Sequence, residues 1–123
     1  MNTRKEVLIV SPPGDLQIGL QALLITHLDV DVLVVGEAAS GMMAIERHSP
    51  AVVVLDQNIL GQMVPAFVQD VKACWPLIHC IVLANDDLGR QEMIAAGADQ
   101  VVIKGVPGAR LISDIKLVLN QEK

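Results

Sequence analysis

Short unbroken apolar runs alternate along the chain with longer segments in which apolar residues recur every three or four positions. The runs consist mostly of Val, Ile and Leu, and they occupy residues 7–10, 32–35, 51–55, 80–83 and 101–103. Unbroken runs of this length are typical of strands that are buried on both faces, as in parallel sheets. The pattern therefore predicts five strands, with the longest ending at a carboxylate, Asp56.

The segments between the runs predict five helices, because their apolar residues fall on one side at helical spacing. We expect Asp15, Ser40 and either Asp86 or Asp87 to cap helix starts, and Gly97 to end a helix in the left-handed conformation. The predicted helices cover residues 15–28, 40–48, 65–74, 86–96 and 107–120.

Five strands that alternate with helices predict an α/β fold with a parallel sheet covered on both faces. The simplest arrangement is a flavodoxin-like (βα)5 three-layer sandwich with strand order 2-1-3-4-5, formed by residues 1–123 as one domain. In that order the carboxyl ends of strands one, three, four and five surround a common crevice. The residues at those ends are Ser11-Pro12, Asp56, Ala84 and Lys104.

Composition narrows the range of partners. The net charge is −5 and there is no cluster of Lys or Arg, which argues against direct binding of nucleic acid or anionic membranes. No apolar run approaches the roughly 20 residues needed to span a bilayer. Cys74 and Cys80 lack CxxC spacing, so we interpret them as reduced core thiols of a cytoplasmic protein.

At this point the chain resembles a response-regulator receiver domain of two-component signalling over essentially its whole length. The segments that carry the resemblance are residues 35–38, 55–61, 96–99 and 102–104. Residues 35–38 and 55–61 are most similar to receivers joined to helix-turn-helix DNA-binding output domains. The resemblance implies that Asp56 accepts a phosphoryl group and that Lys104 pairs with the phosphoryl oxygens. It also implies that the backbone carbonyl of Asn58 is a metal ligand.

Other positions depart from the family pattern. Ser11 and Pro12 stand where the family has an acidic pair that holds Mg²⁺, and Ala84 stands where it has Thr or Ser. Val101 replaces an aromatic residue that reports the phosphorylation switch. Because Mg²⁺ prefers carboxylate and water oxygens, a metal at this degenerate pocket is not expected. Asp56 and Lys104 could instead neutralise each other as a structural ion pair.

Two roles for Asp56, phosphoacceptor and structural partner of Lys104, therefore stay open. The leading interpretation is a non-enzymatic phosphorelay receiver that signals through protein–protein contacts with impaired Mg²⁺-dependent phosphorylation. The alternative is a conventional receiver phosphorylated on Asp56 by a histidine kinase. A remote alternative is a flavin-binding electron carrier on the same fold, although prolines in the loop after strand one remove the N–H donors that a phosphate would need.

No cofactor is expected except Mg²⁺, and that only if the pocket still works. The expected partners are proteins: a histidine kinase, an output domain, or a second copy bound through the last helix. Leu117 falls off the buried stripe of that helix and would lie on such a surface.

Overall fold

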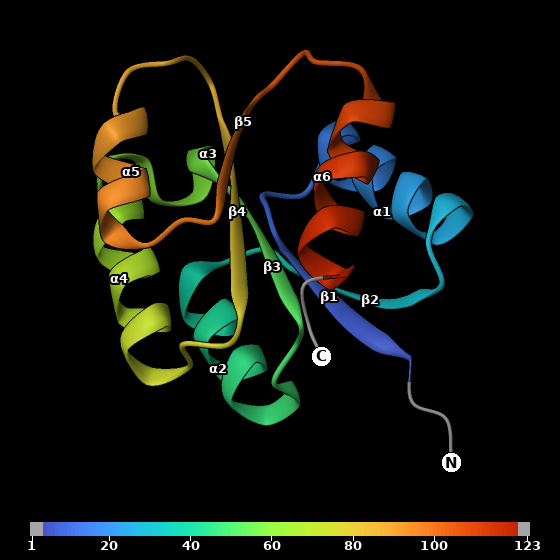
Figure 1. Cartoon of the computed structure of the whole chain (residues 1–123), viewed down its shortest axis with the longest axis horizontal. Coiled ribbons are helices and arrows are strands. Elements are labelled where there is room, and N and C mark those ends of the chain that lie inside the picture. Colours follow the sequence, from blue (N-terminus) through green and yellow to red (C-terminus); the bar gives the residue numbers. More distant parts are fainter. Residues whose placement is uncertain (1–3, 121–123) are drawn as a thin grey trace.

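The carboxyl ends of five parallel strands meet at one edge of a single sheet in the computed structural model, which describes residues 4–120 (Figure 1). The strand order is β2-β1-β3-β4-β5, which confirms the predicted flavodoxin-like topology. The elements are β1 (Lys5–Val10), α1 (Asp15–His27), β2 (Val30–Val35), α2 (Ala38–His48), β3 (Val52–Asp56), α3 (Gln57–Leu60), the 3-10 helix η1 (Gly61–Met63), α4 (Val64–Cys74), β4 (His79–Ala84), α5 (Arg90–Ala96), β5 (Gln100–Ile103) and α6 (Gly108–Asn120).

Successive side chains of the strands point to opposite faces of the sheet and so supply two separate cores. In β1, Leu8 and Val10 belong to the core that α2, α4 and α5 cover, whereas Val7 and Ile9 belong to the core that α1 and α6 cover. Figure 1 shows α1 and α6 together on one side of the sheet. Because both faces are covered, the central parts of the inner strands are apolar, which explains the unbroken runs in the sequence.

The strand register places the polar residues at the strand ends close together. Val10 is level with Val35 of β2 and with Leu55 of β3, so Ser11 and Asp56 follow at the same height. On the other side of β3, the backbone N–H of Lys104 donates to the carbonyl of Ala84 at 2.8 Å. The sheet therefore brings four residues together at the carboxyl ends of its strands: Ser11, Asp56, Ala84 and Lys104.

The predicted capping residues of three helices were wrong. Gly14, not Asp15, is the residue before α1, and Asp15 lies in the first turn, where a carboxylate favours the helix dipole. Helix α2 begins at Ala38 rather than at Ser40, so Ser40 lies inside it.

Helix α5 begins at Arg90 after Gly89, and neither Asp86 nor Asp87 caps it. The Asp86 carboxylate accepts from the backbone N–H of Leu88, and Asp87 pairs with Arg90. Both aspartates thus organise the loop before the helix. Gly97 does end α5 with a left-handed φ of 118°, as predicted.

Two further features differ from the sequence-based expectation. Periodicity did not predict α3 and η1, because elements of three or four residues are too short to show a repeat. Cys74 was expected in the core but is exposed at the end of α4, whereas Cys80 on β4 is buried as expected. Within residues 4–120, none of the helices combines the length and the apolar character needed to cross a membrane.

Candidate functional site

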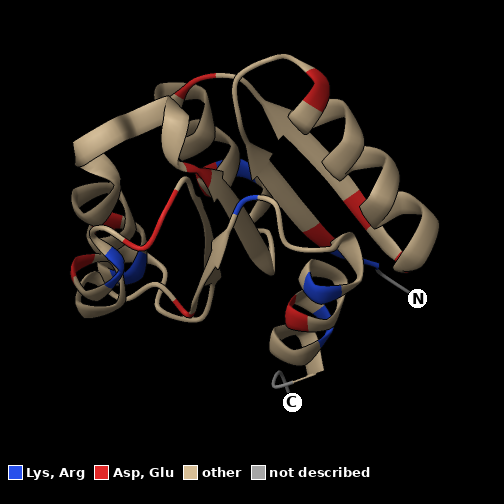
Figure 2. Cartoon of the chain, turned by 90° about the horizontal axis from the view of Figure 1, so that it is seen from above, with Lys and Arg blue, Asp and Glu red and all other residues tan. Residues whose placement is uncertain are grey.

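Asp56 is the last residue of β3, the central strand, and lies at the edge of the sheet that Figure 2 views from above. Only 2% of its surface is exposed, and Asp56 and Ser11 are the buried polar residues of the described chain. A carboxylate at this depth must have partners, because an unpaired buried charge is strongly unfavourable.

The Asp56 carboxylate accepts three hydrogen bonds. Lys104 Nζ lies 2.5 Å from Oδ1, which also accepts from the backbone N–H of Asn58 at 2.9 Å. The Ser11 hydroxyl donates to Oδ2 at 3.1 Å. Both carboxylate oxygens are thereby occupied, one by a cation and a backbone donor and the other by a neutral hydroxyl. The structure thus brings together Asp56, Lys104 and Ser11.

The loop after β1 positions Ser11 beside Asp56. The backbone N–H of Ser11 donates to the carbonyl of Val35 at 3.1 Å, and its own carbonyl accepts from the Gln17 side chain at 2.8 Å. Pro12 is partly exposed and can donate no backbone hydrogen bond. The two positions therefore offer one neutral hydroxyl and no carboxylate.

Amide side chains join the loops after β3 and β4 across the mouth of the site. The backbone N–H of Asn85 donates to Gln57 Oε1 at 2.8 Å, and the Asn85 side chain donates to Asn58 Oδ1 at 2.9 Å. Sequence reasoning missed this link, although three amide residues at adjacent strand ends were the signal that could have revealed it. We call the residues Gln57, Asn58 and Asn85 the amide latch.

Ala84 and Val101 are both buried and apolar. Ala84, fully buried at the end of β4, offers no hydroxyl toward Asp56. Val101 packs in the core under α4 and α5, and its carbonyl accepts from the Arg90 guanidinium at 3.2 Å. The side chains at the two positions contribute apolar packing and no hydrogen-bonding group.

The donor set at Asp56 does not fit Mg²⁺. That ion requires six oxygen ligands in near-octahedral geometry, and proteins hold it with one or two carboxylates plus waters and phosphate oxygens. Among residues 4–120, Asp56 is the carboxylate that takes part in these contacts, and Lys104 already neutralises it. No cluster of three or more His, Cys, Asp or Glu residues suited to a metal occurs anywhere in residues 4–120.

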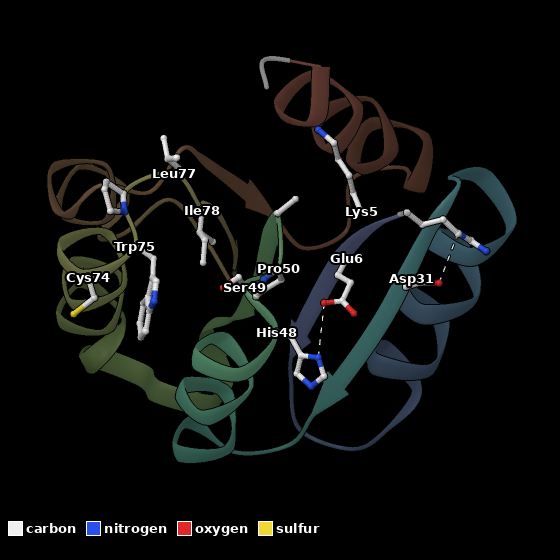
Figure 3. A pocket seen from close by; sticks show the side chains of 13 residues that line it. Lys5, Glu6, Asp31, His48, Ser49, Pro50, Cys74, Trp75, Leu77 and Ile78 are labelled. Carbon is white, nitrogen blue, oxygen red and sulfur yellow. Dashed lines mark ion pairs between the residues drawn. The ribbon is translucent and has the colours of Figure 1, made fainter. Parts of the chain in front are cut away.

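Two cavities lie away from Asp56. A wide depression of about 1000 Å³ opens at the opposite edge of the sheet, between an apolar wall at Trp75 to Ile78 and a charged wall with the Glu6–His48 pair (Figure 3). A smaller cavity of about 240 Å³ lies between α1 and α6, and Lys104 and Asp15 are its charged lining residues. Asp56 lines neither cavity.

Burial of the Cys80 thiol raises its pKa to about 12, and the nearby Asp99 carboxylate adds to this effect, while the Lys72 ammonium opposes it. A thiol with a raised pKa stays protonated at neutral pH, and the thiolate is the form that acts as a nucleophile. Cys80 is buried in the core, as the sequence predicted.

Comparisons with known proteins bear on the fold. No protein-family model matches the sequence, and no curated protein matches it. Solved structures do match. A receiver domain from Methanospirillum hungatei superposes with a TM-score of 0.88 at 20% identity, and the match covers 97% of this chain and 96% of that one.

Two receiver domains of histidine kinases are also similar. The domain from Syntrophus aciditrophicus gives a TM-score of 0.85 at 20% identity, over 97% of this chain and 92% of that one. The domain from Pseudomonas aeruginosa, which holds a magnesium ion in its active-site cleft, gives 0.83 at 17% identity, over 96% and 99%. The chain thus has the flavodoxin-like fold of response-regulator receiver domains.

Proposed function

We propose that this chain is a receiver-type module of two-component signalling that acts through protein–protein contacts and in which Mg²⁺-dependent phosphorylation of Asp56 is impaired. The observation that carries the proposal is the occupied carboxylate: Lys104, Asn58 and Ser11 use both oxygens of Asp56. Under this hypothesis, Asp56 and Lys104 form a structural ion pair in which the two charges neutralise each other without a metal.

The chemistry of phosphoryl transfer supports this reading. The transferred group carries charge on its outer oxygens, and catalysis depends on positioning and on nearby positive charge, most of it from a metal. At this site the positive charge comes from Lys104 alone, and Ala84 has no hydroxyl to bind a phosphoryl oxygen. Asp56 would also have to leave its present partners before it could react.

The proposed module is non-enzymatic and cytoplasmic, and its partners are proteins such as a histidine kinase or an output domain. The conventional alternative keeps the same fold and partners but has Asp56 phosphorylated, with Mg²⁺ bound at the site. The flavin-carrier alternative is weaker, because residues 11–14 provide a single hydroxyl and two prolines where a phosphate would bind. Purified protein without a flavin absorption spectrum would exclude it.

A titration of the protein with Mg²⁺ and then with beryllofluoride, a phosphoryl mimic, tests the proposal by amide NMR. We expect no saturable shifts at Asp56, Asn58, Ala84 and Lys104 at millimolar Mg²⁺. Shifts that cluster at these residues and disappear in Asp56→Asn would overturn the proposal and establish the conventional switch. Asp56→Asn is the matched control because it removes the negative charge and keeps the size of the side chain.

A further inference from the structure

Helices α1 and α6, which lie side by side on one face of the sheet (Figure 1), leave between them the cavity of about 240 Å³ described above. We call it the α1–α6 cavity. Its walls are mainly aliphatic side chains from the two helices, β4 and β5, among them Leu16, Leu20, Leu23, Leu83, Val102 and Leu111. Protein interiors are close-packed and contain few spaces larger than a water molecule, so an aliphatic space of this size is a distinct feature.

The size and the walls of the cavity indicate what it can hold. An apolar cavity of about 150 Å³ lined by aliphatic side chains stays dry and binds benzene. The α1–α6 cavity is larger, so it has room for a benzene ring with a short side chain.

Glycines leave part of this space open. Gly19 of α1 and Gly105 after β5 both line the cavity, and a Cβ atom at either position would meet no neighbouring atom within 4 Å. Gly108 at the start of α6 lies against the opposite wall, since a Cβ atom there would lie 3.1 Å from Cδ2 of Leu23. A larger side chain at Gly19 would therefore fill space that is now open.

Two charged residues, Lys104 and Asp15, line the cavity. The Lys104 ammonium lies 2.5 Å from Asp56 Oδ1, so this cation already has its counter-ion. Asp15 is exposed in the first turn of α1 and forms no ion pair within residues 4–120. A helix N-terminus carries only about half a positive charge, so the charge around Asp15 remains negative. The net charge of −5 on the whole chain also favours a cation.

We propose that the α1–α6 cavity binds a small organic amine, with an apolar ring or chain between the helices and an ammonium group at Asp15. The apolar part removes aliphatic wall from water, and the ammonium complements the carboxylate that has no other ion-pair partner. A ligand that carries a carboxylate would instead be repelled by Asp15. Binding uses neither oxygen of Asp56, so the inference does not depend on whether Asp56 is phosphorylated.

The two parts of such a ligand contribute unequally. Burial of the apolar part supplies most of the affinity, and a molecule of this size is expected to bind with a dissociation constant of about a millimolar or below. An ion pair at an exposed carboxylate is weak, so Asp15 should improve the affinity by about threefold. Asp15 therefore determines which ligands are preferred more than how tightly they bind.

Amide NMR of the full chain with phenethylamine as the probe tests the proposal. We expect saturable shifts that cluster at Gly19, Leu23, Gly105 and Gly108. Phenethyl alcohol has the same ring without the charge and should bind about threefold more weakly, whereas hydrocinnamate, which carries a carboxylate, should bind about tenfold more weakly than the amine.

Asp15→Asn tests the charged part of the site. It removes the negative charge and keeps the size of an exposed side chain, so the protein should remain folded. In this variant the amine and the alcohol should bind equally well, because the ring still enters the cavity and the ammonium no longer has a partner. A preference for the amine that persists in Asp15→Asn would overturn the assignment of Asp15.

Gly19→Leu tests the cavity itself, and Ala22→Leu is its matched control. Ala22 lies on the same helix, is exposed and does not line the cavity. Gly19→Leu should weaken the binding of the amine and the alcohol by about tenfold or more, because leucine occupies the space of the ring, whereas Ala22→Leu should leave both affinities unchanged. Thermal unfolding confirms that each variant is folded, and the Asp15→Asn comparison still tests the site if Gly19→Leu does not fold.

Three results would overturn the proposal. They are the absence of saturable shifts with phenethylamine, shifts that cluster away from α1 and α6, and equal affinities for the amine and the alcohol in the unchanged protein.

Discussion

At the scale of single residues, the environment of Asp56 determines what this site can do. Its carboxylate is buried, and its three hydrogen-bond donors include one cation, Lys104, whose side chain is 20% exposed. Removing one member of a buried ion pair leaves the other charge without compensation, whereas removing both members is far less harmful. The contribution of the Asp56–Lys104 pair to the free energy of unfolding is therefore best measured by changing each partner alone and then both together.

We predict that Lys104→Met lowers the free energy of unfolding by about 3 kcal/mol, the lower end for a broken buried pair because Lys104 still reaches solvent. Asp56→Asn should lower it less, since the freed ammonium can turn toward water. The double variant should be more stable than Lys104→Met alone. Urea unfolding of the unchanged protein, the two single variants and the double variant completes a double-mutant cycle. Additive effects of the two changes would show that the pairing of Asp56 with Lys104 contributes nothing to stability.

At the scale of elements, a glycine can adopt a backbone conformation with positive φ that other residues disfavour. Gly97 ends α5 at a φ of 118°, and a Cβ atom there would lie 2.9 Å from Cγ of Lys72. Gly19 lies inside α1, and a Cβ atom there would meet no neighbouring atom within 4 Å. The same change at these two positions should therefore have opposite effects.

Gly97→Ala should lower the free energy of unfolding by more than about 1 kcal/mol, because alanine resists a positive φ and would crowd Lys72. Gly19→Ala should raise it by about 0.5 to 1 kcal/mol, because alanine favours the helix interior. Thermal and urea unfolding measure both. Equal effects at the two positions would contradict the conformations of α5 and α1 described above.

At the scale of the whole molecule, the site exists because loops from separate strands meet at one edge of the sheet. Ser11 follows β1, Asp56 ends β3, Asn85 follows β4 and Lys104 follows β5. The proposed function attributes impaired metal binding to the absence of carboxylates in the loop after β1, where Ser11 and Pro12 lie. If their absence impairs metal binding, introducing carboxylates there should confer it.

We predict that Ser11→Asp combined with Pro12→Asp confers millimolar or tighter Mg²⁺ binding, because it supplies two carboxylates beside Asp56. Amide NMR with Mg²⁺ measures the gain, and Ser11→Asn with Pro12→Asn is the uncharged control. The acidic variant should be less stable without metal, since three carboxylates then face one lysine. If neither pair of changes alters Mg²⁺ binding, the fold at this edge differs from a metal-binding receiver in more than its ligands.

The order of elements and the strand topology follow from the pattern of the sequence. Unbroken, Val-rich apolar runs such as residues 52–55 are typical of strands covered on both faces, and alternation with helices leaves few ways to arrange them. The same reasoning placed Asp56 and Lys104 at one edge, because the carboxyl ends of parallel strands coincide. These conclusions depend on periodicity and chain direction, which a sequence contains directly.

The contacts between loops and the exposure of particular side chains became known from the three-dimensional structure. The hydrogen bond from Ser11 to Asp56 and the amide latch depend on which elements become neighbours. Cys74 is exposed at the end of α4, although its neighbours in the sequence, Ala73 and Trp75, are apolar. Sequence patterns report which face of an element is apolar, whereas packing in three dimensions decides which face is covered.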